Sequence, residues 1–235
     1  MIKITNVYDN LTHNKNFKSD WGFSCLIEHP NEKILFDTGA HPEILEENLK
    51  KVQIDPGLID KVIISHKHWD HSGAVIWLAK QNPNLKIYLP RTWSRKLESQ
   101  LLDCVEQVIT VEKDMKISED LQIIFSKNIF INELVLGIKT SQGIVLITGC
   151  SHTGIDKIVA KSVNYGNILA VLGGFHLFRS STNRIKKIIS YMQKLDIKFI
   201  APCHCTGENA IKILSERLPQ QFYNNGVGAE YLFEL

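Results

Sequence analysis

The feature that most restricts how this chain can fold is a dense group of polar residues after one short apolar run. The run, residues 61–65, has the β-branched composition of a buried strand and leads directly into His66-Lys67-His68-Trp69-Asp70-His71. Residues 72–79 then indicate the start of a helix. The six residues therefore form a strand-to-helix loop. A solvated loop with hydrogen-bonding histidines is the alternative, but three imidazoles and a carboxylate in six residues favour a metal site.

The spacing within this loop suits two neighbouring cations. His66 and His68 are two residues apart, so they can point the same way while the chain is still extended. Asp70 and His71 can then turn toward the same point as the chain bends. Imidazole suits zinc, iron, nickel and copper, and a carboxylate also accepts manganese or iron, so the ligand set is compatible with zinc without being exclusive to it.

Three later apolar runs each end in a histidine. The runs begin at residues 144, 168 and 198, and they lead to His152, His176 and His204. In an α/β sheet the carboxyl ends of parallel strands lie along one edge, where ligands collect. We therefore expect six of the nine histidines to converge on one cleft, with His13, His29 and His41 outside it.

The rest of the pattern predicts one α/β domain over residues 1–235, since no Pro-, Gly- or Ser-rich linker and no repeat divides it. Residues 9–21 indicate a long loop. Residues 23–29 with 33–36, and 133–139 with 144–148, indicate two hairpins. Further strands are predicted at 87–89, 105–111 and 121–125, and helices at 42–53, 92–102 and along the apolar stripe from 185 to 195.

Composition limits the classes of function. The 235 residues are 44% hydrophobic and 22% charged, which is typical of a globular protein. A net charge of +2 without a basic run gives no reason to expect a nucleic acid polymer as partner. Without a long apolar stretch or a leader-like N-terminus, no membrane association and a cytoplasmic location are expected.

Among the five cysteines, Cys25 and Cys104 are expected to be buried thiols, and Cys203 and Cys205 packing residues. The oligomeric state is left open.

These motifs resemble the metallo-β-lactamase superfamily, in which His-x-His-x-Asp-His follows a buried strand and Leu35-Phe36-Asp37-Thr38-Gly39 stands upstream. Four further segments, at 21–24, 148–155, 173–177 and 202–207, resemble the branch of 7,8-dihydropterin-6-yl-methyl-4-(β-D-ribofuranosyl)aminobenzene 5′-phosphate synthase-like hydrolases. The resemblance implies an αββα sandwich of two mixed β-sheets flanked by helices, with a dinuclear metal site between the sheets.

The resemblance also implies which residues hold the two ions. His66, His68 and His152 would hold one, whereas the other would be held by Asp70, His71 and His204. Asp37 is implied as a carboxylate that orients a ligand, which is physically reasonable because a metal-bound imidazole needs a partner for its other N–H; a plain turn residue is the alternative. The expected ions are zinc, with manganese or iron also allowed.

Two positions depart from a simple assignment. Many members of the superfamily have a bridging Asp where this chain has Cys150, which is either a thiolate ligand or a small buried residue that leaves the second ion weakly held. His176 is expected to act as general acid or to contact substrate; the alternatives are a metal ligand and a structural histidine. Arg179 and Ser180, just before a helix, could bind phosphate or serve only near its cap.

The sequence thus predicts a metal-dependent hydrolase in which Asp70 orients a metal-activated hydroxide and His176 protonates the leaving group. The expected substrate is a phosphorylated small molecule: a phosphoester or cyclic phosphodiester that is pterin- or nucleotide-like. Two alternatives remain: an iron-dependent redox enzyme of the same fold, and a non-catalytic protein that binds a small ligand.

Overall fold

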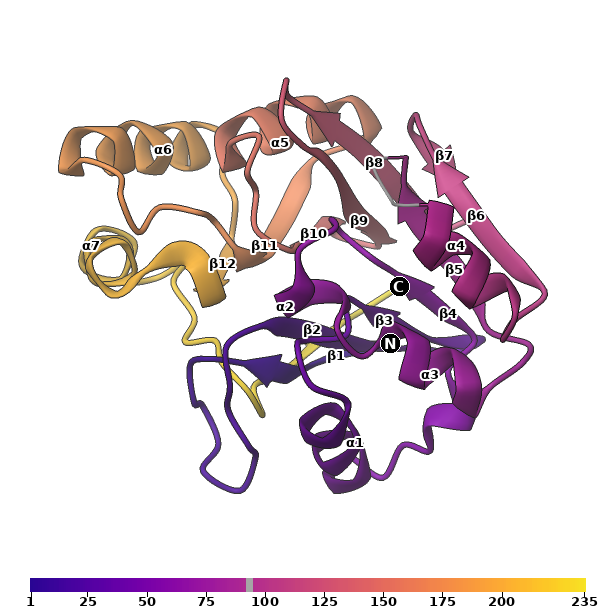
Figure 1. Ribbon diagram of the computed structural model, residues 1–235. Coiled ribbons are helices and arrows are strands. Elements are labelled where there is room, and N and C mark those ends of the chain that lie inside the picture. Colours follow the sequence, from indigo (N-terminus) through magenta and orange to yellow (C-terminus); the bar gives the residue numbers. More distant parts are fainter. Residues whose placement is uncertain (92–94) are drawn as a thin grey trace.

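Two β-sheets face each other, and helices cover the outer face of each (Figure 1). The structure, a computed structural model, describes residues 1–91 and 95–235. This four-layer arrangement confirms the αββα sandwich of mixed sheets predicted from the sequence.

The first sheet has seven strands in the order β13-β1-β2-β3-β4-β5-β6. Its neighbours from β3 to β6 are parallel, whereas β13, β1, β2 and β3 pair antiparallel. The strands are β1 (Ile2–Asp9), β2 (Phe23–His29), β3 (Glu32–Phe36), β4 (Lys61–Ile63), β5 (Lys86–Pro90), β6 (Gln107–Val111) and β13 (Glu230–Phe233).

The second sheet has six strands in the order β12-β11-β10-β9-β8-β7. β10, β11 and β12 are parallel to one another, and the remaining pairs are antiparallel. The strands are β7 (Met115–Lys116), β8 (Leu121–Lys127), β9 (Asn132–Thr140), β10 (Gly143–Thr148), β11 (Ile168–Gly174) and β12 (Phe199–Cys203).

Amphipathic helices close both outer faces, because each buries one apolar stripe on its sheet. Leu45, Leu78 and Leu101 of three helices pack on the first sheet, and Ile158, Ile188 and Leu214 of three others pack on the second. The helices are α1 (Pro42–Lys51), α2 (Trp69–Ser72), α3 (Val75–Gln81), α4 (Arg95–Leu102), α5 (Ile155–Ser162), α6 (Thr182–Lys194) and α7 (Glu208–Arg217), with single 3-10 turns η1 (Pro56–Leu58), η2 (Val163–Tyr165) and η3 (His204–Thr206).

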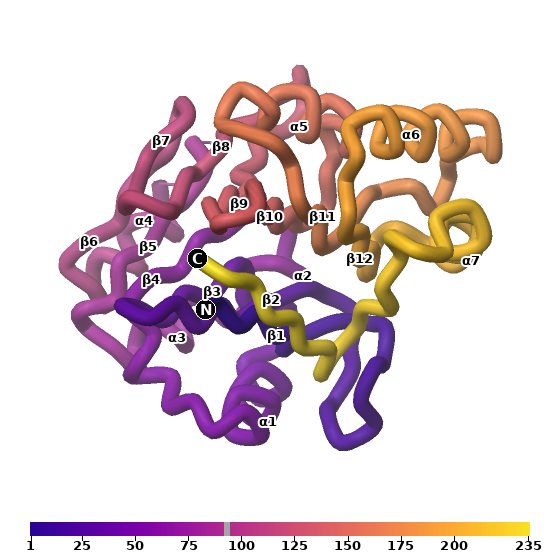
Figure 2. Tube along the Cα trace, turned by 180° about the vertical axis from the view of Figure 1, so that it is seen from behind, coloured from indigo at the N-terminus to yellow at the C-terminus, as the bar shows by residue number. Residues whose placement is uncertain are grey.

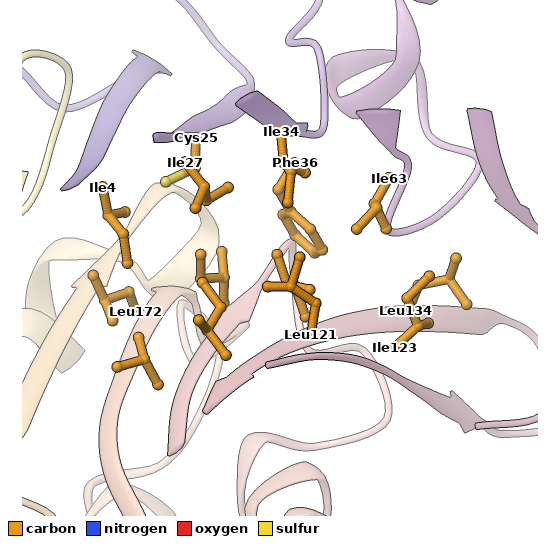
Figure 3. Close-up of a cluster of buried hydrophobic side chains, with 14 of the residues drawn as sticks. Ile4, Cys25, Ile27, Ile34, Phe36, Ile63, Leu121, Ile123, Leu134 and Leu172 are labelled. Carbon is orange, nitrogen blue, oxygen red and sulfur yellow. The ribbon is translucent and has the colours of Figure 1, made fainter. Parts of the chain in front are cut away.

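The largest apolar core lies between the two sheets. Figure 3 shows side chains of the first sheet, among them Ile27, Phe36 and Ile63, opposite Leu121 and Leu172 of the second. Alternate residues of each strand point inward, so this core follows from the period-two pattern of the strands. It fixes the two sheets against each other and so fixes the edge at which the strands end.

Most predicted elements are present, with shifted ends. The loop at 66–71 is partly helical, because α2 already begins at Trp69 and carries Asp70 and His71. The predicted helix at 92–102 is observed as α4 from Arg95; its residues 92–94 lie outside the described residues. Cys104 is half-buried rather than buried, because it follows the exposed end of α4. Two short strands at sheet edges, β7 and β13, were not predicted.

The two ends of the chain lie near each other, since β1 pairs with β13 (Figure 2). No helix in the part of the chain that the structure describes is long and apolar enough to cross a membrane.

Candidate metal centre

The predicted ligands gather at one edge of the sandwich, where parallel strands of both sheets end. In the first sheet, parallel strands β3 and β4 lead to Asp37 and His66. In the second, parallel strands β10, β11 and β12 lead to Cys150, His176 and His204. Residues more than a hundred positions apart therefore meet at the same place, as the common strand direction requires.

The backbone at these strand ends is unusual. The angle φ is 61° at Asp37, 60° at Ser151, 52° at His176 and 48° at His204. L-residues rarely adopt this left-handed region because Cβ crowds the following carbonyl oxygen. Among the other described non-glycine residues, only Gln53 and Asp196 have positive φ. Backbone strain concentrated in this way is typical of functional sites, where sharp turns must carry chemically useful side chains.

The first donor set is formed by His66, His68 and His152. Nε2 of His66 lies 2.9 Å from Nδ1 of His68 and 3.3 Å from Nε2 of His152. One ligand atom from each residue lies within 4.8 Å of the others. These are the three residues predicted to hold one ion.

The second donor set is formed by Asp70, His71 and His204. Nε2 of His71 lies 3.2 Å from Nε2 of His204, and Oδ2 of Asp70 lies 3.4 Å from the latter atom. Again all three ligand atoms lie within 4.8 Å of one another. Four of the six residues in the two sets are buried, whereas His152 is half-buried and His68 is exposed.

Asp37 fixes the imidazoles of both sets. Its Oδ2 accepts a 2.7 Å hydrogen bond from Nδ1 of His71 and another, also 2.7 Å, from the Ser65 hydroxyl. The same hydroxyl oxygen lies 2.9 Å from Nδ1 of His66, so it can accept the proton of that ring. Nδ1 of His204 has its own acceptor, Oδ1 of Asn10 at 2.7 Å. Each of these three histidines thus holds its proton on Nδ1.

This arrangement of protons fits a site for cations. With the Nδ1 atoms of His71 and His204 protonated, the facing Nε2 atoms of the neutral rings present only lone pairs, so their 3.2 Å approach is not a hydrogen bond between neutral rings. Lone pairs that face one another in a buried space repel unless a positive charge lies between them. The donor arrangement therefore fits divalent metal ions.

Cys150 stands between the two sets. Its Sγ lies 3.2 Å from Nε2 of His71 and belongs to compact groups of possible ligands with His66, with His152 and with His204. This is the position expected of a ligand shared by both ions. Burial raises the pKa of the Cys150 thiol, so the thiolate form requires a cation beside it.

His152 is held by residues that sequence reasoning missed. The backbone N–H of His152 donates to Oε1 of buried Glu133, at 2.7 Å, and the next N–H, of Thr153, donates to Oε2 at 2.9 Å. The side-chain amide of Asn128 donates to the carbonyl oxygen of His152. A lone carboxylate in an apolar strand was the one available indication for Glu133; Ser65 and Asn10 carried none beyond their places beside a histidine and in the long loop.

His176 lies at the margin of the first set, with its ring 4.2 Å from that of His152 between centroids. Its buried Nδ1 has no hydrogen-bond partner in the structure. Arg179 and Ser180 follow on the surface, where the guanidinium lies 5.3 Å from the Phe178 ring centre. The cap of α6 is Ser181, whose hydroxyl accepts from the Arg184 N–H, so Ser180 is not needed for capping.

The environment sets the protonation states of the donor groups. Burial and the charge of His71 hold the pKa of His66 well below its usual range, and burial with the charge of His176 lowers the pKa of His152 to about 3. Burial alone would raise the pKa of Asp70, but the imidazoles of His204 and His71 beside it outweigh burial and lower that pKa. His204 differs, because the carboxylates of Asp70 and Asp9 outweigh burial and raise its pKa, so this ring would release a proton when a metal binds.

Comparisons with known proteins agree with this geometry. The sequence pattern of the metallo-β-lactamase superfamily matches residues 22–160, which is more than half of the chain. The chain therefore belongs to the metallo-β-lactamase superfamily.

Particular relatives cover almost the whole chain. The 7,8-dihydropterin-6-methyl-4-(β-D-ribofuranosyl)-aminobenzene-5'-phosphate synthase of Methanocaldococcus jannaschii is 29% identical over 94% of this chain and 93% of its own length. An uncharacterised protein of the same organism is 32% identical over 92% of this chain and 94% of its own length. A crystal structure of a metal-dependent hydrolase of the β-lactamase superfamily superposes with a TM-score of 0.85 at 28% identity, covering all of both chains.

Proposed function

We propose that the protein hydrolyses a phosphoester or cyclic phosphodiester of a pterin- or nucleotide-like small molecule. The observation that carries this proposal is the pair of donor sets that meet at Cys150. Two such sets suit two divalent cations, zinc first and manganese or iron as alternatives. When bound, the two cations would supply a hydroxide nucleophile at neutral pH and a positive clamp for the phosphoryl oxygens.

In this proposal Asp70 orients the attacking water. Its carboxylate lies beside His204, and its lowered pKa keeps it ionised and able to accept a hydrogen bond from that water. His176, in its imidazolium form, delivers a proton to the leaving group. Nδ1 of His176 is buried without a hydrogen-bond partner among the described residues, so the proton given up would come from Nε2.

The phosphorylated character of the substrate has two supports. Exposed Arg179 follows His176 by three residues, and a guanidinium is well suited to a phosphate. The synthase relative is named for a compound that joins a dihydropterin to a ribofuranosyl phosphate. Hydroxide attack on phosphorus also requires that the negative charge of the phosphoryl oxygens is neutralised, which two cations in the paired donor sets would do.

The experiment is hydrolysis of bis-p-nitrophenyl phosphate by protein that is first stripped of metal and then loaded with zinc, manganese or iron. We expect turnover with at least one metal, its loss in His68→Ala and Asp70→Asn, and its retention in His13→Ala, which changes an exposed histidine outside the site. Tight retention of metal and small ligands without turnover would support the binding-protein alternative. Native iron together with an oxygen-dependent activity would support the redox alternative.

A further inference from the structure

The exposed Trp and Phe side chains of this protein lie beside the metal centre, whereas the exposed Tyr165 and Tyr223 lie elsewhere. In the described part of the chain, the exposed Trp and Phe residues are Trp21, Trp69, Phe130 and Phe178, which are 49%, 60%, 81% and 52% exposed. We call these four residues the aromatic rim. Large rings left in water forgo the stabilisation that burial would give them, so a group of them points to a ligand.

Each member of the rim adjoins a residue of the donor sets or His176 at their margin. The ring of Trp21 lies 5.2 Å from that of His204 between centroids. The ring of Phe178 lies 5.3 Å from that of His176. Trp69 stands between His68 and Asp70 in the sequence and begins α2.

Phe130 is tied to the site through the turn between β8 and β9. Oδ1 of Asn128 accepts the backbone N–H of Phe130 at 2.8 Å, and the amide nitrogen of the same side chain donates to the carbonyl of His152 at 3.2 Å. One asparagine therefore shapes the turn that carries the ring and joins it to a predicted ligand.

Two rim residues are held in place by close backbone packing. A Cβ on Gly22 would lie 2.6 Å from the carbonyl oxygen of Asp70, so the residue after Trp21 packs directly on the metal-binding loop. A Cβ on Gly207 would lie 2.7 Å from Cα and Cβ of Phe178. Both glycines have positive φ, 149° and 82°, and leave no room for a side chain. The backbone that carries each ring is therefore held in place, which lowers the cost of ordering the two residues around a ligand.

The rim comes from both halves of the sandwich. Trp21 leads into β2 and Trp69 follows β4 of the first sheet, whereas Phe130 precedes β9 and Phe178 follows β11 of the second. A flat group that enters from solvent would meet ring faces from two sides. The Arg179 guanidinium beside Phe178 adds a second planar, cationic surface.

We propose that the aromatic rim binds a planar heteroaromatic ring system of the substrate, placed next to the phosphate that cations in the donor sets would bind. This inference rests on the proposed function and specifies which residues hold the ring of its substrate. An aromatic ring fits better than an alkyl chain, because stacking uses the faces of rigid rings and is favourable for any flat π-system.

The test compares two phosphodiesters with the same leaving group: thymidine 5′-(p-nitrophenyl phosphate), which carries a base, and methyl p-nitrophenyl phosphate, which does not. The measured quantity is the ratio of kcat/KM for the first to kcat/KM for the second. We expect this ratio to fall about tenfold in Trp21→Ala, Trp69→Ala and Phe178→Ala. Trp21→Phe should keep most of it, and Leu58→Ala, which removes an exposed apolar side chain elsewhere, should keep all of it.

A binding measurement separates this proposal from the proposed function. Binding of adenosine 5′-monophosphate to the metal-loaded protein is followed by quenching of tryptophan fluorescence, and binding of ribose 5-phosphate by its competition with that ligand. We expect the Kd of adenosine 5′-monophosphate to be at least tenfold lower than that of ribose 5-phosphate. If this difference in affinity is found but no substrate is hydrolysed, the hydrolase proposal fails and the proposed role of the aromatic rim is supported. Hydrolysis with an unchanged ratio in all three alanine variants overturns the rim alone. Equal affinity for the two monophosphates also overturns it.

Discussion

The carboxylate of Asp37 accepts a 2.7 Å hydrogen bond from Nδ1 of His71, and neither side chain is exposed to solvent. The same carboxylate oxygen accepts from the hydroxyl of Ser65, which in turn reaches His66. One buried carboxylate thus sets the proton position of an imidazole in each donor set. Asp37 therefore supports both donor sets, although it belongs to neither.

Asp37→Asn should therefore lower the metal affinity of both donor sets together. An amide keeps the shape but cannot accept both protons as well as a carboxylate, and loss of such a partner typically lowers metal affinity about 10- to 100-fold. Ser65→Ala should lower mainly the metal affinity of the donor set that contains His66. Competition with a chromogenic chelator, followed over two equivalents of zinc, measures each affinity. Loss of a single affinity in Asp37→Asn would contradict the shared role.

Cys150 should be a metal ligand, because its sulfur lies among donors of both sets. Cobalt-substituted protein is expected to show a sulfur-to-cobalt charge-transfer band that disappears in Cys150→Ser. Cys25 is the matched control, because its thiol is also buried but lies in the apolar core between the sheets. The proposed ligation fails if the band survives in Cys150→Ser or is lost equally in Cys25→Ser.

Metal removal should lower thermal stability, since ions that bind the folded chain alone stabilise it by mass action. Free zinc at about a hundred times its Kd contributes about 2.7 kcal/mol. For a chain of this size that corresponds to a rise in Tm of about 5–10 °C. Scanning calorimetry of chelator-treated and zinc-loaded protein checks this. A variant with both His68→Ala and His204→Ala should show no such rise, and an equal rise in that variant would place the stabilising zinc elsewhere.

The sequence predicted that the histidines at the strand ends would lie together, because their positions follow from strand direction. His66, His152 and His204 each come just after a run with strand periodicity, and parallel strands end at one edge. Cys205 shows where that reasoning stopped. Its neighbours predict a packing residue, which agrees with its burial, but only the folded chain shows that it contacts Cys150 across the turn after β10.

The supports of the site were harder to predict than its ligands. Glu133 begins β9 and meets His152 only because β9 pairs with β10, and Asn10 meets His204 from a loop without periodicity. Such contacts depend on register and on loop conformation, which local patterns do not specify. The rim residue Phe130 was missed for the same reason, since a single aromatic residue in a turn has no period.

Glu133→Gln should destabilise the protein and loosen His152. The two carboxylate oxygens accept the backbone N–H groups of His152 and Thr153, and a glutamine would present an N–H₂ group to one of these donors. An unsatisfied buried donor costs about 1–3 kcal/mol, which for a chain of this size lowers Tm by about 2–12 °C. Measurement on metal-free protein isolates this effect from any loss of bound ion.

Exposed Glu119→Gln is the control and should leave Tm unchanged within about 1 °C, because surface substitutions usually have small effects. Equal Tm values for the two variants would show that Glu133 does not hold this turn, whereas a lower Tm with reduced zinc affinity would identify it as the residue that positions His152.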